Sequence, residues 1–321
     1  MSSISSQALN PFNFDWLDSS GCLCNSQRQF LAGKLLKFVM QAFSDIGGLI
    51  IDMDGVLWHG DMAQPGLEAF FQTIRGLNLP FVLATNNANL SPEQYVAKLA
   101  KMNVSVDLPE VLTSGMATAQ YLAERYRPAE TRVFVIGGVG ARQPLLDLGF
   151  TLTGLDDVDG ERRADIVVSG LDKELSWDKL CAAALNIQVG ADFYGTNGDA
   201  TLPSERGFLP GNGATLAALT AATGVTPTII GKPEPVIYRQ ALALLGVDPD
   251  RVIAIGDRLD TDILGAVRTG IRSLLVLSGI SRESDIADLD YAPTWVMQDI
   301  QAFTRALLSI NQGDNHEKIH R

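Results

Sequence analysis

The sequence has few cysteines, fewer bases than acids and no long apolar run, and each shortage argues against a class of protein. Its three cysteines, Cys22, Cys24 and Cys181, form no disulfide or zinc framework. Lys and Arg number 25 against 37 Asp and Glu, a net charge of −12, whereas a general nucleic-acid binder needs a basic surface. No apolar run approaches the length of a membrane span. We therefore expect neither nucleic acid nor a membrane as partner, and an anionic substrate would need local positive groups or a metal.

The amino-terminal segment lacks the features of a targeting signal. It has no basic start followed by an apolar core, and it carries acids at Asp15 and Asp18, so we expect a cytoplasmic protein. Apolar residues recur at helical spacing between Arg28 and Phe43. We predict that residues 1–44 form an extension with one amphipathic helix. Packing of that helix against its own domain is favoured over binding to a membrane surface or a partner.

The most informative stretch is Gly48–Trp58, in which a short apolar run ends in Asp52 and Asp54. A run of this length that begins at glycine is typical of a strand buried on both faces of a parallel sheet. If the chain stays extended, the two acids point to the same side, because strand side chains alternate. Two carboxylates in a partly dry crevice need a cation, a shared proton or deep solvation. Solvated acids in a turn are the alternative for this stretch taken alone.

Strand-like and helix-like segments alternate along the chain, which predicts a doubly wound parallel α/β sheet. The length of 321 residues favours two domains. We predict a main domain built from residues 45–128 and 225–310, with an inserted α/β domain at 129–224. The apolar stretch Val225–Ile230 is expected to be a strand of the main sheet. The polar residues 311–321 are predicted to be a frayed tail.

Two further polar groups follow predicted strands. Thr85, Asn86 and Asn87 offer a hydroxyl and amides that could hold phosphate oxygens, although this triplet is also ordinary turn chemistry. Lys232 follows another apolar run, and Pro233 biases it toward an extended conformation, so its ammonium group would project from the strand end. A solvated lysine is the alternative for that position.

Acids again end an apolar run at Asp257, Asp260 and Asp262. Capping of the next helix would explain Asp260 or Asp262, but it explains Asp257 less well. Ligands of open parallel sheets bind outside the carboxyl ends of the strands, so all four polar groups are expected in one crevice. Oxygen-rich clusters of acids suit Mg²⁺. One carboxylate could then attack phosphorus while the metal and Lys232 neutralise the phosphoryl oxygens.

The ordered motifs DMDGVLW, ATNN, GKP and GDRLDTD resemble the four motifs of the haloacid dehalogenase-like phosphatases. They most resemble class IIA, which includes p-nitrophenyl, phosphoglycolate, pyridoxal, and ribonucleotide or sugar phosphatases. In that class a large α/β cap is inserted between the second and third motifs, where this sequence predicts its inserted domain. Thr196-Asn197-Gly198-Asp199 followed by Gly211-Asn212-Gly213 is also similar to the end of such a cap. The resemblance covers about residues 45–308, and four motifs in order are specific where each alone is weak.

The resemblance implies catalytic roles for three residues. Asp52 would be the nucleophile that forms an aspartyl-phosphate. Asp54 would protonate the leaving alkoxide and then activate the water that breaks the intermediate. Lys232 would neutralise charge between the nucleophile and the phosphoryl group.

The resemblance also implies how substrate and metal are held. Thr85 and the amide after it would bind the transferring phosphoryl group, with Asn86 and Asn87 in the same substrate-binding segment. Mg²⁺ would be bound by the Asp52 side chain, the Asp54 carbonyl, Asp257 and, through a water, Asp262.

The activity implied is a Mg²⁺-dependent phosphomonoesterase that acts on a small phosphorylated metabolite. Phosphoglycolate, sugar phosphates, nucleoside monophosphates and pyridoxal phosphate all remain open as substrates. One alternative is a phosphotransferase or mutase that uses the same intermediate; another is a catalytically silent binding protein, which a missing nucleophile would favour. Relatives pair through their caps, so the resemblance also suggests a homodimer through the cap.

Overall fold

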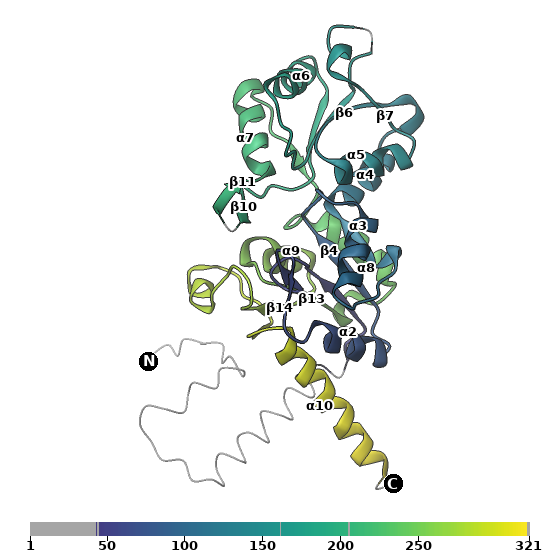
Figure 1. The fold of residues 1–321 in the computed structure, drawn as a ribbon, viewed down its shortest axis with the longest axis vertical. Coiled ribbons are helices and arrows are strands. Elements are labelled where there is room, and N and C mark those ends of the chain that lie inside the picture. The colour runs from purple at the N-terminus through teal and green to yellow at the C-terminus, as the bar shows by residue number, and fades with distance from the viewer. Residues whose placement is uncertain (1–42, 44, 161, 205, 320–321) are drawn as a thin grey trace, which may run out of the picture.

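The computed structural model describes residue 43 and residues 45–160, 162–204 and 206–319 (Figure 1). The amphipathic helix expected in residues 1–44 lies outside the described residues, apart from its last position. Two parallel sheets, each with helices against its faces, make up the two parts of the molecule. The predicted doubly wound α/β fold is therefore confirmed. No helix within the described ranges is both long and apolar enough to cross a bilayer.

The larger sheet has six parallel strands with β1 near its middle. In spatial order they are β15 (Trp295–Met297), β14 (Arg272–Val276), β13 (Val252–Gly256), β1 (Gly48–Ile51), β4 (Phe81–Thr85) and β5 (Val111–Thr113). Leu49 of β1 is in register with Ile253 on one side and Phe81 on the other. Every residue of β1 is buried, as a near-continuous apolar strand in a covered parallel sheet should be. Because these strands are parallel, the polar residues that follow β1, β4 and β13 all lie at the carboxyl end of the sheet.

Helices cover both faces of this sheet. Their bounds are α2 (Leu67–Gly76), α3 (Pro92–Lys101), α4 (Ser114–Ala123), α8 (Pro235–Leu245), α9 (Leu264–Thr269) and α10 (Ile300–Ile319). Leu49 and Phe303 belong to the apolar core on one face, whereas Ile50 and Tyr238 belong to the core on the other. Adjacent residues of β1 therefore fill different layers, as strand alternation requires.

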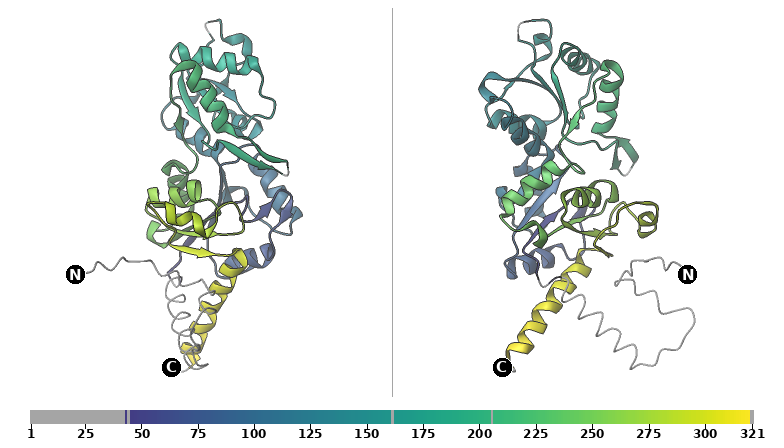
Figure 2. Two further views of the ribbon diagram at one scale, coloured as in Figure 1. Left: turned by 90° about the vertical axis from the view of Figure 1, so that its left-hand side faces the viewer. Right: turned by 180° about the vertical axis from the view of Figure 1, so that it is seen from behind.

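The second sheet is smaller and has five parallel strands. In spatial order they are β12 (Thr228–Ile229), β9 (Asp192–Gly195), β8 (Ile166–Ser169), β6 (Arg132–Ile136) and β7 (Thr151–Leu152). With it come α5 (Val139–Asp147), α6 (Trp177–Gln188), α7 (Asn212–Thr223) and the hairpin of β10 (Thr201–Ser204) and β11 (Gly207–Pro210). This unit is called the cap below. In all three ribbon views it lies at the end of the molecule opposite to α10 (Figures 1 and 2).

The remaining described elements are short. A two-stranded hairpin, β2 (Trp58–His59) and β3 (Met62–Ala63), follows β1, and a π-helical turn, Leu259–Ile263, precedes α9. Single 3₁₀ segments lie at Leu108–Glu110, Pro128–Glu130, Leu155–Asp157, Pro249–Arg251 and Glu283–Asp288.

One strand lies in a different sheet from the one predicted. The stretch Val225–Ile230 was expected in the main sheet, but only Thr228–Ile229 is a strand, and it pairs with β9 in the cap. Ile229 packs against the apolar cluster of the cap, and the backbone N–H of Ile230 donates to the carbonyl of Gly195. The cap sheet therefore ends after residue 224. Apolar composition marks a buried strand but does not distinguish between two parallel sheets in one chain.

The carboxyl-terminal stretch also differs from expectation. Residues 311–319, predicted to be a frayed tail, continue helix α10. Extending an existing helix fixes one residue for each added hydrogen bond, so polar residues can prolong a helix whose first turns are packed. Ile300, Phe303 and Leu307 supply that packing.

Candidate active site

At the carboxyl end of the larger sheet, two predicted acids, Asp52 and Asp262, contact the predicted lysine, Lys232. The Lys232 ammonium group donates to Asp52 Oδ1, to Asp262 Oδ1 at 2.7 Å and to the carbonyl of Ala84 at 3.0 Å. All three ammonium hydrogens therefore have acceptors. The lysine is 3% exposed, so it is not the solvated side chain that was the alternative.

The ionisation of this cluster is coupled to its burial. Burial by itself would lower the pKa of Lys232, but the carboxylates of Asp262 and Asp52 outweigh it and hold the lysine protonated. Burial raises the pKa of Asp52 well above its ordinary range, and Lys232 opposes that rise. Burial, followed by the neighbouring Asp262 carboxylate, raises the pKa of Asp257 to about 7. The single positive charge of Lys232 therefore does not neutralise all three buried carboxyl groups.

The acids fit a divalent cation. Asp52, Asp257 and Asp262 each present an oxygen within 4.8 Å of the others. Asp257 Oδ1 is buried and has no hydrogen-bond partner among the described residues. An unpaired buried carboxylate oxygen is costly, and a cation bound there would satisfy it. A set of oxygen donors of this kind suits Mg²⁺.

A loop that the sequence analysis did not single out supports Asp257. The backbone N–H of Ile280 donates to Asp257 Oδ2 at 2.8 Å, and Ser281 N–H donates to the Asp257 carbonyl at 3.1 Å. A Cβ on Gly279 would lie 1.9 Å from Asp257 Oδ2, so this close approach requires glycine. The loop follows β14, and the rule that ligands bind beyond strand ends could have drawn attention to it.

Gly55 meets the same carboxylate from the opposite loop. Its φ is +85°, a conformation that favours glycine, and a Cβ there would lie 2.4 Å from Asp257 Oδ2. Ser278 Oγ donates to the Gly55 carbonyl at 2.8 Å, which joins the loop after β1 to the loop after β14. The glycine of the first motif therefore makes room for the third acid.

The segment after β4 forms a turn around Thr85. The Asn87 N–H donates to Thr85 Oγ1 at 3.0 Å, and Asn87 Oδ1 accepts from Asn89 N–H at 3.1 Å. Because Thr85 Oγ1 is the acceptor in this contact, its hydroxyl hydrogen can donate elsewhere. Asn87 uses its side chain to close the turn.

Asn86 holds the main chain of Lys232. Its Oδ1 accepts from Lys232 N–H at 2.8 Å, and its Nδ2 donates to the Lys232 carbonyl at 2.9 Å. The same Nδ2 donates to Asp199 Oδ2 of the cap at 3.1 Å. Of the predicted phosphate-binding groups, these contacts leave the Thr85 hydroxyl and the backbone better placed to receive a ligand than the two asparagine side chains.

Asp54 lies beside the cluster on the turn that leads into β2. Its side chain is exposed, and its Oδ1 accepts from the indole N–H of Trp58 at 2.8 Å. The three-acid cluster does not include the Asp54 carboxylate. That is compatible with the expectation that Asp54 offers a metal its carbonyl and keeps its carboxyl group for proton transfer.

Comparisons with known proteins agree with this geometry. The model of the haloacid dehalogenase-like hydrolases matches residues 49–151, and a HAD-hydrolase-like model matches residues 229–303. An acid sugar phosphatase of Staphylococcus aureus is 36% identical over 251 residues, which are 78% of this chain and 94% of that protein. The chain belongs to the haloacid dehalogenase-like hydrolases.

Solved structures place it more closely among the class IIA phosphatases of that family. A 4-nitrophenylphosphatase from Thermotoga maritima has a TM-score of 0.77 and 31% identity, covering 84% of this chain and 99% of its own. A glycerol phosphate phosphatase from Mycobacterium tuberculosis, solved in complex with magnesium, has a TM-score of 0.74 and 33% identity. That match covers 84% of this chain and 77% of the other. The family predicted from the four motifs is confirmed, and the chain is a phosphatase.

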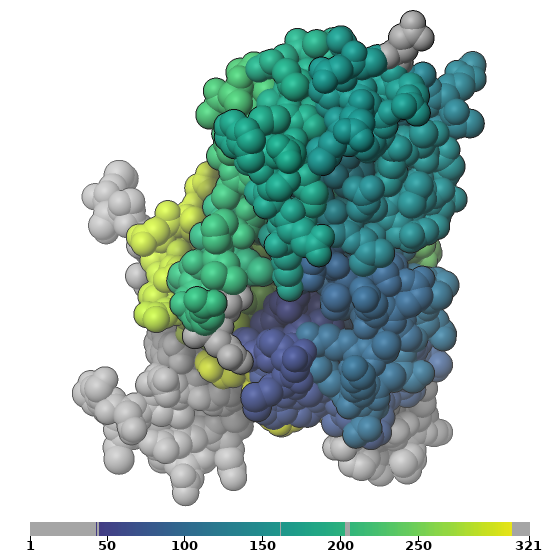
Figure 3. Space-filling model, turned by 45° about the horizontal axis from the view of Figure 1, so that its top comes forward, coloured from purple at the N-terminus to yellow at the C-terminus, as the bar shows by residue number. Residues whose placement is uncertain are grey.

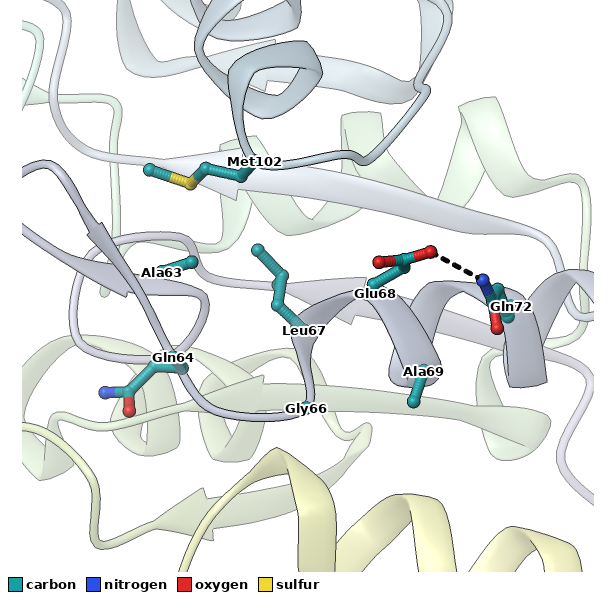
Figure 4. Close-up of a pocket in the computed structure, with 8 residues that line it drawn as sticks. All are labelled: Ala63, Gln64, Gly66, Leu67, Glu68, Ala69, Gln72 and Met102. Atoms are coloured by element: carbon teal, nitrogen blue, oxygen red, sulfur yellow. Dashed lines mark hydrogen bonds between the residues drawn. The ribbon is translucent and has the colours of Figure 1, made fainter.

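The cap of this phosphatase meets the core beside the site. Asp199 Oδ2 accepts from Asn86 of the core and, at 2.6 Å, from Asn197 of its own loop. Figure 3 shows the teal and green residues of the cap packed against the blue and purple face of the core. A groove of about 510 Å³ lies elsewhere, against α2 (Figure 4). It is lined by Ala63, Gln64, Gly66, Leu67, Glu68, Ala69, Gln72 and Met102, and includes no predicted site residue.

Proposed function

We propose that this class IIA phosphatase is a Mg²⁺-dependent phosphomonoesterase of small phosphate esters that works through an aspartyl-phosphate on Asp52. The observation that carries the proposal is the cluster of Asp52, Asp257 and Asp262 at the carboxyl end of the sheet, in which Asp52 and Asp262 contact the buried ammonium group of Lys232. Asp257 keeps one oxygen unpaired in that cluster. An arrangement that only stabilised the fold would not leave a buried carboxylate oxygen without a hydrogen-bond partner.

The residues of the chain divide the reaction into two steps. In the first, a carboxylate oxygen of Asp52 attacks phosphorus, the ester P–O bond breaks, and Asp54 gives a proton to the departing oxygen. In the second, Asp54 takes a proton from water, whose oxygen attacks phosphorus and releases phosphate with Asp52 restored. Lys232, held by Asn86, keeps a positive charge beside the Asp52 nucleophile. The Thr85 hydroxyl would donate to the phosphoryl oxygens.

The metal-binding part of the proposal rests on the acids. Asp52, Asp257, Asp262 and the Asp54 carbonyl would hold Mg²⁺. When bound, Mg²⁺ neutralises charge on the phosphoryl oxygens and on the carboxylates around it.

The names of the relatives support a proposal for the substrate class. Proteins named for sugar phosphates, glycerol phosphate and 4-nitrophenyl phosphate all match this chain over most of its length. We infer that the substrate is a small phosphorylated polyol or sugar that fits beneath the cap. A cytoplasmic location and a homodimer through the cap stay predictions.

The decisive experiment measures inorganic phosphate released from sugar phosphates, glycerol phosphate and 4-nitrophenyl phosphate. Each ester is tested with Mg²⁺ and with a chelator, for the wild type and for Asp52→Asn. We expect release that requires Mg²⁺ and falls by at least about a thousandfold in the variant, because the covalent step is lost. Release that survives Asp52→Asn would refute the nucleophile. Transfer of phosphate to an added alcohol in preference to water would favour the phosphotransferase alternative.

A further inference from the structure

Trp58 contacts the predicted general acid from within the hydrophobic core. Its side chain has no exposed surface, and its indole N–H donates to Asp54 Oδ1 at 2.8 Å. The turn between the two residues is closed by the backbone, since Gly55 N–H donates to the Trp58 carbonyl at 2.8 Å. A buried aromatic ring four residues further on therefore reaches back to an exposed carboxyl group.

This contact restricts a side chain that is otherwise free to rotate. It is the one side-chain hydrogen bond that Asp54 makes within the described residues. An indole N–H only donates, so the Asp54 oxygen facing it must act as acceptor. The transferable proton must then be carried by Oδ2, the oxygen that Trp58 does not contact.

Helix α3 fixes Trp58 in turn. The Tyr95 ring stacks on Trp58, with centroids 6.3 Å apart and planes 18° apart, and Tyr95 Oη donates to the Asn87 carbonyl at 2.7 Å. Lys98 Nζ lies 4.5 Å above the Trp58 ring and donates to the Gly60 carbonyl at 2.6 Å. Tyr95 and Lys98 are one helical turn apart and so lie on one side of α3. The helix thereby connects the phosphate-binding turn to the group that holds Asp54.

We propose that Trp58 is a positioning residue for proton transfer, holding Asp54 so that Oδ2 delivers the proton to the leaving oxygen. The proposal rests on the function proposed above, in which Asp54 is the acid. The proton moves from Asp54 Oδ2 to the ester oxygen as the P–O bond breaks, and a proton from water returns to Oδ2 in the second step. Trp58 keeps its own hydrogen throughout.

A comparison of two esters distinguishes a role of Trp58 in positioning Asp54 from a general loss of activity caused by disturbed packing. A 4-nitrophenolate leaves as an anion and needs little protonation, whereas the alkoxide of glycerol phosphate needs a proton as it leaves. The value of kcat/KM reports the steps up to release of the alcohol. It therefore depends on proton transfer to the leaving oxygen and not on the later hydrolysis of the aspartyl-phosphate. A fault in packing alone would lower kcat/KM for both esters alike.

The test compares Trp58→Phe with Trp295→Phe in the holoenzyme with Mg²⁺. Trp58→Phe keeps a ring for Tyr95 and Lys98 but removes the N–H. Trp295 is a buried indole of the core whose ring packs against Phe43 at a tilt of 45°. We expect Trp58→Phe to lower kcat/KM for glycerol phosphate about tenfold and for 4-nitrophenyl phosphate by less than about threefold. Trp295→Phe should leave the ratio between the two esters unchanged. Equal losses for both esters, or no loss, would overturn the proposal.

A second substitution covers the case in which Trp58→Phe folds poorly. Benzothienylalanine at position 58 replaces the N–H with sulfur at nearly the same shape. We again expect kcat/KM to fall more for glycerol phosphate than for 4-nitrophenyl phosphate. Asp54→Asn should show that difference more strongly. If Asp54→Asn lowers kcat/KM equally for the two esters, the assignment of Asp54 as the acid fails. If Asp54→Asn affects glycerol phosphate more but neither Trp58 replacement does, only the positioning role of Trp58 fails.

Discussion

At the residue scale, the contacts of Lys232 suit catalysis better than they suit the stability of the fold. A buried ion pair is weak evidence for stability, because desolvation of the charges offsets most of their attraction. Here one ammonium group serves two carboxylates, and a third acid stands beside them with an unpaired oxygen. We expect the arrangement to be less stable without a cation than with one. That difference can be measured as a dependence of stability on pH and on metal.

Asp257→Asn should stabilise the metal-free protein at alkaline pH. The folded-state pKa of Asp257 is raised to about 7, above its ordinary value, so its contribution to stability is present at acidic pH and is lost as pH rises through about 7. In chelator at pH 8 the variant should melt several degrees above the wild type, and at pH 4 the difference should vanish. Added Mg²⁺ should reverse the order, because it binds the folded wild type more tightly.

The matched control is Asp250→Asn, at an exposed acid away from the site. Thermal melting at several pH values, with and without Mg²⁺, gives both results. A wild type that is already the more stable protein in chelator at pH 8 would contradict the raised pKa of Asp257.

At the scale of elements, the loop after β14 holds Asp257, a proposed metal ligand, in place through its backbone. Gly279→Ala should move either the loop or Asp257, since the added Cβ would lie 1.9 Å from Oδ2. We expect the affinity for Mg²⁺ to fall by about ten- to a hundredfold, as when groups that hydrogen-bond to metal ligands are lost, while the fold is kept. Isothermal titration with Mg²⁺ measures this. Gly76→Ala, at a helical glycine whose Cβ would meet nothing within 4 Å, should bind normally. Wild-type affinity in Gly279→Ala would show that this close approach is unimportant.

The elements that sequence alone predicted are those with a strong local signal. The apolar run of β1, which ends in acids, is the example with the strongest signal. Strands β2, β3, β5 and β15 have two or three residues each, too few for any periodicity to show. The sheet to which β12 belongs is decided by pairing with β9, a contact distant in sequence.

The residues of the site also differ in whether the sequence carries a signal for them. Side chains with charge at strand ends, such as Asp52, Asp257 and Lys232, were found because their chemistry is visible in the sequence. The supporting groups were not, since Ile280 acts through a backbone N–H and Gly279 through the absence of a side chain. The hydrogen bond from Trp58 to Asp54 was not predicted either, because it depends on a turn that composition does not encode.

At the scale of the whole molecule, Asn86 and Asp199 couple the cap to the catalytic core. Asn86→Ala removes both contacts to the Lys232 backbone and the contact to the cap. Asp199→Ala leaves the Lys232 contacts in place and removes the contact to Asn86, together with the hydrogen bond from Asn197 within the cap. We expect kcat/KM for a sugar phosphate to fall more in Asn86→Ala than in Asp199→Ala. The double variant should be little worse than Asn86→Ala, because residues that share one contact are not additive. The coupling energy expected for a hydrogen bond to a carboxylate is about 1.5–3 kcal/mol.

Asp192→Ala provides the control for that cycle, because Asp192 is a cap carboxylate that accepts a hydrogen bond from Tyr126 and none from Asn86. Combined with Asn86→Ala, it should give losses that add. If the losses from Asn86→Ala and Asp199→Ala add as well, the contact between cap and core has no part in catalysis, and the cap acts on the substrate alone. If they do not add, the position of Lys232 and the closure of the cap are linked through one amide group. The core would then reach its active geometry only with the cap in place.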